Sequence, residues 1–261
     1  MLTTAFVPGS PNWVDLGTPD INVAMTFYGG LFGWQFGSAG PDAGGYGFFT
    51  SGGRTVAGGM ELRDSPAPAA WTVYFRSDDV DATARAVRGA QGAVLTGPDD
   101  VMDKGRMAIF ADPMGASFGV WRPGTLTGLD VAGEAGALCW VELHTTDVAG
   151  AAGFYHSALG WETSSVSFPG GAYTSVNPAG AGEAAMFGGL VGSADDPAEG
   201  GTHWLPYFAV TDVDAVTGRA RERGGSVHLG PVDVEGVGRM ARLADPHGAR
   251  FAVLRPEPPR S

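Results

Sequence analysis

The chain has 261 residues, of which 44% are hydrophobic, and a formal net charge of −12. With one lysine and scattered arginines, it lacks the clustered positive charge that binding to phosphate backbones requires, so we expect no nucleic-acid partner. Its apolar runs are shorter than the roughly 18 residues of a membrane span, and the N-terminus has no signal-like pattern. We therefore expect a cytoplasmic protein with no membrane partner.

The first half of the chain predicts strands and helices in alternation. A strand precedes Asp20, and the helical spacing of apolar residues from Ile21 to Leu31 predicts a helix that Asp20 caps. A second helix is predicted over 80–88, after Asp78-Asp79. Runs rich in strand-forming residues and bounded by glycine and proline predict further strands over 45–50, 55–62, 106–111 and 116–122.

The second half repeats the first. Trp13 and Trp140 are 127 positions apart (140 − 13), and Trp71 and Trp204 are 133 apart (204 − 71). The turn sequence Asp112-Pro113-Met114-Gly115 also returns as Asp245-Pro246-His247-Gly248. The same order of elements is therefore expected twice, in two domains of ordinary size. A polar internal loop is predicted over 192–202, with 64–70 as its shorter counterpart.

The order of these motifs resembles the vicinal oxygen chelate superfamily, which includes glyoxalase I, bleomycin-resistance proteins and extradiol dioxygenases. The resemblance rests on Phe27-Tyr28 in the first helix, Leu31 to Trp34 after it, and Asp-Pro-x-Gly before the last strand of each copy. Within the superfamily, the chain looks most like two-domain actinobacterial members that are hydroxylase-like or antigen-like, or that belong to antibiotic biosynthesis.

The resemblance implies an α+β fold in which four βαβββ units form two tandem glyoxalase-like domains with cup-shaped sheets. We place the first domain at 9–123, a linker at 124–136 and the second domain at 137–256. In this fold a ligand or metal lies against the concave face of the sheet. Whether βαβββ units pair within a domain or swap between domains stays open at this point.

Alternation along the strands predicts which side chains face each cup. Val14 and Leu16 are expected to pack under helices, which leaves Trp13 and Asp15 for the concave face. The resulting candidates for ligand binding are Trp13, Asp15, Thr72, Tyr74 and Trp121 in the first cup, and Trp140, Glu142, His144, His203, Leu205 and Tyr207 in the second.

The positions at which metal-dependent relatives carry ligands hold poor ligands in this chain. The resemblance maps these positions onto Trp13, Thr72 and Gly119 in the first domain and onto Trp140, Leu205 and Ala252 in the second. Of the residues near a fourth position, only Glu61 qualifies, and one carboxylate does not supply the three or four ligands of a usual site. We therefore expect no metal and no cofactor. A site formed by His144, His203 and Glu142 is the alternative.

An acid stands two residues after the tryptophan in both copies, as Asp15 and Glu142. On an apolar wall such an acid either pairs with Arg76, Arg250 or backbone N–H groups, or acts as a general base. Glu142, His144 and Tyr207 are the candidate catalytic residues. The first copy has Gly17 where the second has His144, so chemistry is expected in the second cup.

Other repeated features have structural interpretations. Arg106 and Arg239 are expected to cover apolar surface and to pair with nearby acids. The pairs Gly44-Gly45, Gly58-Gly59 and Gly188-Gly189 lack the setting of a phosphate loop and are interpreted as tight turns or bulges. Cys139, the single cysteine, is expected to be an inert buried thiol.

The leading hypothesis is a metal-independent protein that binds a small, largely apolar or aromatic metabolite. Such a protein would act in antibiotic sequestration, in resistance or in secondary-metabolite biosynthesis. The alternative is a glyoxalase-like lyase, or another enzyme of this fold, that uses acid–base residues of the second domain. The expected partner is a small molecule, and the expected state is a monomer or a homodimer.

Overall fold

The computed structural model describes residues 2–62, 67–168, 171–192 and 201–257, and within them each repeat forms two α-helices and eight strands. The first repeat contains β1 (Pro11–Thr18), α1 (Ile21–Phe32), β2 (Gln35–Ser38), β3 (Gly47–Ser51), β4 (Arg54–Glu61), β5 (Ala70–Arg76), α2 (Val80–Gly89), β6 (Ala93–Val101), β7 (Gly105–Ala111) and β8 (Ser117–Pro123). The second contains β9 (Leu138–Thr145), α3 (Val148–Leu159), β10 (Trp161–Phe168), β11 (Gly171–Pro178), β12 (Gly188–Gly192), β13 (His203–Ala209), α4 (Val213–Glu222), β14 (Ser226–Val234), β15 (Gly238–Ala244) and β16 (Arg250–Pro256). Most of the predicted loop over 192–202 lies outside the described residues, and so does part of its counterpart over 64–70.

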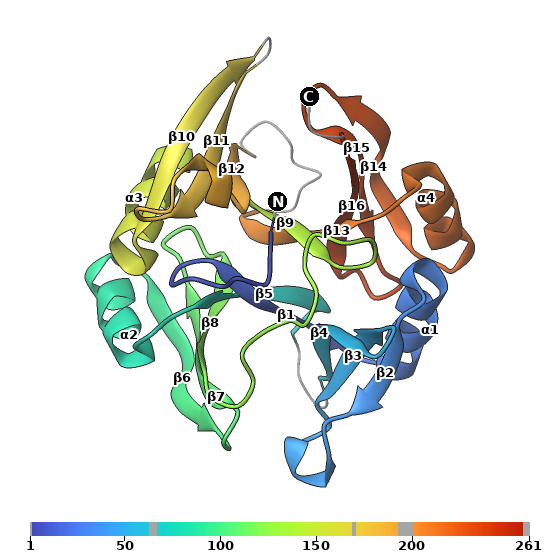
Figure 1. Cartoon of the computed structure of the whole chain (residues 1–261), viewed down its shortest axis with the longest axis horizontal. Coiled ribbons are helices and arrows are strands. Elements are labelled where there is room, and N and C mark those ends of the chain that lie inside the picture. Colours follow the sequence, from blue (N-terminus) through green and yellow to red (C-terminus); the bar gives the residue numbers. More distant parts are fainter. Residues whose placement is uncertain (1, 63–66, 169–170, 193–200, 258–261) are drawn as a thin grey trace. The chain divides into compact units, whose positions relative to one another are not determined.

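The strands form two eight-stranded sheets with the same order (Figure 1). One sheet runs β2-β3-β4-β1-β5-β8-β7-β6 and the other β10-β11-β12-β9-β13-β16-β15-β14. Strands β1 and β4 pair in parallel, as do β5 and β8, β9 and β12, and β13 and β16. The two sheets are open rather than closed. The predicted α+β class, with four βαβββ units in two tandem glyoxalase-like domains, is confirmed.

Four edge strands fell outside the strand runs expected from the sequence. Strand β6 contains Gly97-Pro98 and Asp99-Asp100, which are typical of turns, and its pairing with β7 shifts register on either side of Thr96. Strand β2 has only four residues, most of them exposed. Polar, interrupted edge strands lack the apolar alternation that marks a strand in sequence. Strands β10 and β14 occupy the matching edges of the second sheet.

The chain divides into two compact units, and each combines modules from both repeats. The first compact unit comprises 1–13, 72–128 and 140–205, and the second comprises 14–71, 129–139 and 206–261. Helix α2 therefore packs beside α3 in the first unit, and α1 beside α4 in the second (Figure 1). The sequence left the pairing open; in the structure, modules that pack together come from different repeats.

Aspartate caps begin all four of these helices. Asp20, Asp79, Asp147 and Asp212 each accept a hydrogen bond from a backbone N–H group of the first turn, as predicted for the first of them. Helices α1 and α3 end at Gly33 and Gly160, whose φ angles of 74° and 70° favour glycine. None of the described helices is long and apolar enough to cross a membrane.

In each unit a buried series of hydrogen bonds joins a repeated tryptophan, the tyrosine of a helix and the aspartate of the Asp-Pro-x-Gly turn. In the first unit the indole of Trp204 donates to the Tyr155 hydroxyl at 3.0 Å, and that hydroxyl donates to Asp112 at 3.2 Å. Asp112 also accepts from the backbone N–H groups of Met114 and Ala116. Burial raises the pKa of Tyr155 well above its usual value and also raises that of Asp112. The second unit repeats this chain with Trp71, Tyr28 and Asp245.

Replacing Tyr155 with phenylalanine is expected to lower the free energy of unfolding by about 2 kcal/mol, because Asp112 and the Trp204 indole each lose a buried partner. Denaturant unfolding measures the change. The matched variant Tyr28→Phe in the second unit is expected to behave alike. A change below about 0.5 kcal/mol in both variants would contradict a structural role for this chain of hydrogen bonds.

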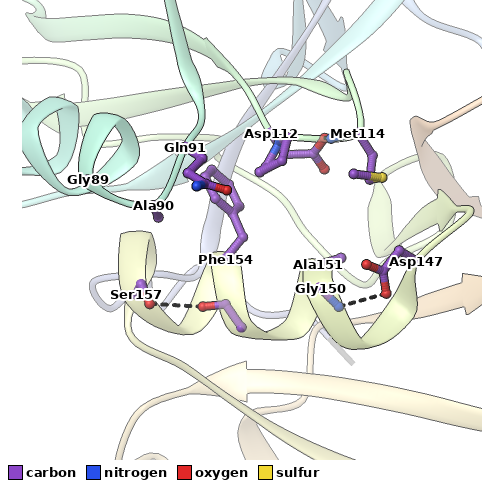
Figure 2. Close-up of a pocket in the computed structure, with 12 residues that line it drawn as sticks. Gly89, Ala90, Gln91, Asp112, Met114, Asp147, Gly150, Ala151, Phe154 and Ser157 are labelled. Atoms are coloured by element: carbon purple, nitrogen blue, oxygen red, sulfur yellow. Dashed lines mark hydrogen bonds between the residues drawn. The ribbon is translucent and has the colours of Figure 1, made fainter.

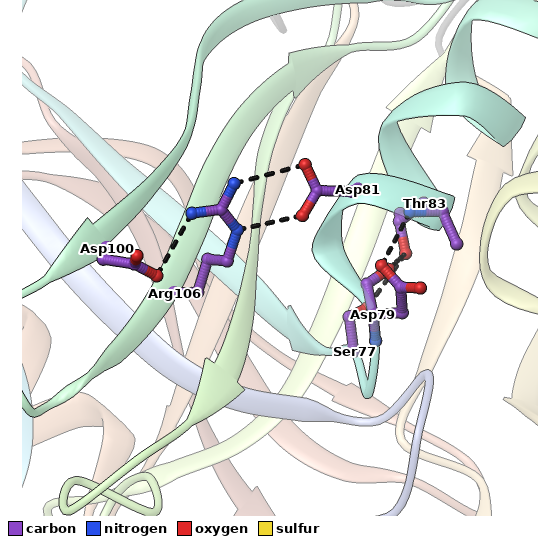
Figure 3. Close-up of polar contacts among 7 residues, drawn as sticks. Ser77, Asp79, Asp81, Thr83, Asp100 and Arg106 are labelled. Atoms are coloured by element: carbon purple, nitrogen blue, oxygen red, sulfur yellow. Dashed lines mark hydrogen bonds and ion pairs between the residues drawn. The ribbon is translucent and has the colours of Figure 1, made fainter.

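The repeated arginines pair with acids on the neighbouring helix and strand, as predicted. Arg106 Nε lies 3.0 Å from Asp81 on α2, and its Nη1 lies 3.1 Å from Asp100 on β6 (Figure 3). Arg239 makes the equivalent contacts with Asp214 and Asp233. A hydrogen bond from Arg106 holds the pKa of Asp81 below its usual value. Because the pKa of Asp81 is lower in the folded than in the unfolded protein, its ionised carboxylate stabilises the fold at any pH above the unfolded-state pKa. This stabilisation is lost as the pH falls through the lower pKa of the folded state.

The variant Arg106→Gln is expected to raise the pKa of Asp81 back toward its ordinary range, because the hydrogen bond that favours the carboxylate is removed. Carbon-detected NMR titration of the side-chain carboxyl groups measures this. Asp214 serves as the control, since its pKa is lowered by Arg239 and should stay unchanged. An unchanged Asp81 pKa would show that the ion pair seen in Figure 3 does not persist in solution.

Candidate functional site

Five side chains of the first compact unit form a continuous set of contacts on β9, β11 and β13. The Trp140 indole N–H donates to the Tyr173 hydroxyl at 2.8 Å, and this hydroxyl donates to Glu142 Oε1 at 2.9 Å. The other carboxylate oxygen, Oε2, lies 3.5 Å from His144 Nε2. The rings of His144 and His203 stack with centroids 5.0 Å apart and an interplanar angle of 13°. We call this set, Trp140, Tyr173, Glu142, His144 and His203, the acid–aromatic chain.

Strand alternation places three members of the chain on one face of β9. Cys139, Val141 and Leu143 are fully buried, and between them Trp140, Glu142 and His144 point to the other side. This is the arrangement that the sequence predicted for the second copy. Its physical reason is the same as in the sequence argument, since the apolar face of the strand is the one covered by helices.

Tyr173 reaches Glu142 across the intervening strand β12. Glu142 is in register with Gly189 on β12, and a Cβ at Gly189 would collide with the Tyr173 hydroxyl and ring. Glycine is therefore needed here for close approach of the tyrosine. The interpretation of the glycine pairs as turns or bulges is confirmed for Gly44-Gly45, which forms a turn with φ angles of 60° and 88°. It is wrong for Gly58-Gly59 and Gly188-Gly189, because these pairs lie within β4 and β12.

The acid–aromatic chain runs from the protein surface into its interior. Glu142 is 8% exposed and His144 is 1% exposed, whereas Trp140, Tyr173 and His203 are half-buried. A buried carboxylate is tolerated when it is hydrogen-bonded, and here Tyr173 meets that need. Tyr173 accepts from Trp140 and donates to Glu142, so its hydroxyl orientation is fixed. The arrangement offers a flat indole beside a carboxylate and two imidazoles, which suits stacking, hydrogen bonding or proton transfer.

The first repeat has a simpler version of the same contact in the second compact unit. The Tyr46 hydroxyl donates to Asp15 Oδ2 at 3.1 Å, as Tyr173 does to Glu142. A tyrosine is thus a partner of each acid, and it was not among the partners expected from the sequence. Arg76, one of the expected partners, bonds to the Phe6 carbonyl and to Asp78. The repeat offered a signal for these tyrosines, because each follows a Gly-Gly pair: Tyr46 comes after Gly44-Gly45, and Tyr173 comes after the pair that ends at 171.

The other aromatic candidates of the first repeat are covered by the chain itself. Trp13 is 5% exposed, and Tyr74 and Trp121 are each 7% exposed. The Tyr74 ring lies over Gly119, and the Trp121 indole donates to the carbonyl of Leu126 at 2.9 Å. Thr72 is half-buried. Trp140 therefore differs from its buried counterpart Trp13 in being half-buried.

Two remaining candidates of the second repeat are buried in different units. Leu205 lies in the first compact unit and Tyr207 in the second, and both side chains are nearly inaccessible. The Tyr207 carbonyl accepts a hydrogen bond from the Cys139 thiol at 3.3 Å. Burial raises the pKa of Cys139 to about 12, so the thiol stays protonated at neutral pH. The expectation that the cysteine is buried is confirmed.

The donor set at the expected ligand positions does not fit a metal ion. Within the part of the chain that the structure describes, no three His, Cys, Asp or Glu side chains are placed to share an ion. In addition, the Tyr74 ring covers Gly119, one of the positions at which the resemblance places a ligand. Glu142 and His144 are neighbours, but two ligands fall short of the three or four that protein sites supply.

Comparisons with known proteins agree with this architecture. A family model described as the Glyoxalase/Bleomycin resistance protein/Dioxygenase superfamily matches residues 10–120 and 137–253. The anthracycline biosynthesis protein DauV of Streptomyces sp. (strain C5) is 41% identical, covering 96% of this chain and 94% of that protein. The "Putative glyoxylase CFP32" of Mycobacterium tuberculosis is 38% identical, covering 96% of both chains.

Among solved structures, the Mn(II)-bound glyoxalase of Novosphingobium aromaticivorans has the same fold with a TM-score of 0.62. It is 17% identical, and the match covers 95% of this chain and 82% of that one. At this identity the likeness concerns the fold alone. The family model and the two relatives show that the chain belongs to the Glyoxalase/Bleomycin resistance protein/Dioxygenase superfamily.

Proposed function

We propose that this protein binds a planar, hydroxylated polycyclic aromatic metabolite on the acid–aromatic chain and assists its biosynthesis or sequesters it. The observation that carries the proposal is the half-buried Trp140 indole, which Tyr173 joins by hydrogen bonds to the buried carboxylate of Glu142. The relative DauV is named as an anthracycline biosynthesis protein, and anthracyclines are molecules of this chemical class. The protein acts in the cytoplasm and without a metal.

The proposed binding mode uses each part of the acid–aromatic chain. A flat ring system stacks on the Trp140 indole, which offers a large contact area at low entropic cost. A phenolic hydroxyl at the edge of the ligand donates to the Glu142 carboxylate, since an ionised carboxylate has two oxygens that each accept more than one hydrogen bond. A buried acceptor of this kind rejects analogues that lack the hydroxyl, because it is left without that bond.

Binding of 1,8-dihydroxyanthraquinone, followed by thermal shift and tryptophan fluorescence, tests the proposal. At a ligand concentration 100 times Kd, binding adds about 2.7 kcal/mol to the stability of the folded state. We expect saturable binding that is weakened at least about tenfold in Glu142→Gln and is unchanged in the matched first-repeat variant Asp15→Asn. Equal affinity for unsubstituted anthraquinone, or equal loss in both variants, would contradict the proposal.

A second candidate function is proton-transfer catalysis, favoured by the 3.5 Å contact between Glu142 and His144. A carboxylate beside an imidazole is suited to moving a proton at a carbon next to a carbonyl. The test is isomerisation of the hemithioacetal formed from methylglyoxal and a thiol, with and without chelator. Turnover that resists chelator and is lost in Glu142→Gln would favour catalysis, and turnover that requires added metal would contradict metal independence.

A further inference from the structure

A cavity of about 420 Å³ lies between α2 and α3 in the first compact unit, apart from the acid–aromatic chain. Figure 2 shows its walls: the end of α2 with Ala90 and Gln91, the turn after β7 with Asp112 and Met114, and the length of α3. Asp147, the N-cap of α3, stands at one end of the cavity, and Ser157 stands at the other.

The lining carries negative charge and no positive charge. Asp112 and Asp147 both line the cavity, while Lys, Arg and His do not occur among its lining residues. The C-terminal end of α2, with its partial negative charge, and the first turn of α3, with the opposite partial charge, both border the cavity, so the net charge of the lining comes from the two carboxylates. The neutral part of the wall consists of the Phe154 ring, the Met114 thioether and small residues. Electrostatics therefore favour a cation in this cavity.

At the corresponding place in the second compact unit an exposed arginine of the protein itself lies against the neighbouring helix. By the repeat offsets, Ala90 corresponds to Arg223 (223 − 133) and Ser157 to Gly30 (30 + 127). Ala90 and Arg223 are both the C-cap residues of their helices. The Arg223 guanidinium lies against Gly30, where any Cβ would collide with its Nε, Cζ and Nη1 atoms. The first unit has the same helix pair but only a methyl group at the position of this arginine.

We propose that the cavity between α2 and α3 binds a small organic cation with a planar amidinium or guanidinium group. The bound group takes the place that Arg223 takes between α4 and α1, with its face against α3. Asp147 uses Oδ1 to accept from the Gly150 N–H at 2.8 Å, and its second carboxylate oxygen supplies the charge at the open end. This site is separate in its residues from the proposed aromatic site.

Titration calorimetry with benzamidine, and with the neutral isostere benzamide, tests the site. We expect one benzamidine per chain, bound at least about tenfold more tightly than benzamide. The variant Ala90→Arg, which supplies the guanidinium from the protein, is expected to weaken benzamidine binding at least tenfold. The control Thr163→Arg, which adds the same charge on β10 outside the cavity wall, is expected to leave binding unchanged.

Two further variants keep the test decisive if Ala90→Arg fails to fold. Ala90→Leu fills the cavity with a neutral side chain and should also weaken benzamidine binding. Asp147→Asn removes the charge but keeps a good helix cap, so it should weaken benzamidine binding a few-fold, and more strongly at low salt. Equal binding of benzamide, or unchanged benzamidine affinity in the folded filling variants, would overturn the proposal. Retention of 1,8-dihydroxyanthraquinone binding by Ala90→Leu separates this outcome from failure of the aromatic site.

Discussion

Replacing Trp161 with alanine is expected to lower the free energy of unfolding by about 4 kcal/mol, since a large aromatic side chain is removed from a fully buried place. Trp161 is 1% exposed and stacks on Tyr155 with centroids 4.6 Å apart. It also packs edge-on against Phe75 and Trp204. Its indole N–H donates to the Gly9 carbonyl at 2.8 Å, so the variant also leaves that acceptor without its donor.

Denaturant unfolding measures this loss, and hydrogen exchange locates it. Trp161→Phe keeps a ring in the cluster and is expected to cost about half as much, while Leu95→Ala on the exposed edge strand β6 should change stability by less than about 0.5 kcal/mol. Exchange of the α3 amides should accelerate in Trp161→Ala. A loss below about 1 kcal/mol would contradict the tight packing of this aromatic cluster.

Replacing Trp140 with alanine is expected to weaken binding of 1,8-dihydroxyanthraquinone about 30-fold, which corresponds to about 2 kcal/mol. Trp140 is the half-buried indole of the acid–aromatic chain, and its N–H also donates to the Tyr173 hydroxyl. Removing it therefore costs both the stacking area and the orientation of the partner of Glu142. Fluorescence titration of the ligand measures the change.

The duplicated chain supplies the matched control for this prediction. Trp13→Ala removes the corresponding indole, which is buried and therefore offers no stacking surface. We expect it to reduce stability through the cavity that it leaves while affinity for the ligand stays within about twofold. If Trp13→Ala weakened binding as much as Trp140→Ala does, the assignment of the ligand to the second repeat would be wrong.

Sequence alone predicted the parts of this structure that depend on local patterns. Alternation placed Val141 and Leu143 under helices and Glu142 and His144 on the opposite face, because strand geometry allows no other assignment. The cap at Asp20 and the pairing of Arg106 with an acid followed from equally local rules. The repeat supported the inferences from strand alternation and from capping and ion pairing, since the sequence shows each of these patterns twice.

The contacts that close the site were not predictable in the same way. Tyr173 meets Glu142 only because it crosses β12 at Gly189, and the two residues are 31 positions apart with no periodic pattern that signals this contact. The pairing of α2 with α3 was open for a different reason. Two similar repeats present similar apolar faces, so the sequence is compatible with modules that pack within a repeat or across repeats. For Arg223 and Ala90 the sequence shows the difference between the copies, but only the structure shows that Arg223 lies against the neighbouring helix and that Ala90 borders a cavity.

The most direct test of the proposed ligand site uses the seven tryptophan indoles as reporters. Their N–H signals are resolved by nitrogen-15 NMR and assigned by single tryptophan-to-phenylalanine variants, and 1,8-dihydroxyanthraquinone is then titrated. The Trp140 signal is expected to shift most, because its ring stacks on the ligand and its N–H bonds to Tyr173. A titration in which Trp13 or Trp121 shifts while Trp140 does not would contradict the assignment of ligand binding to the acid–aromatic chain.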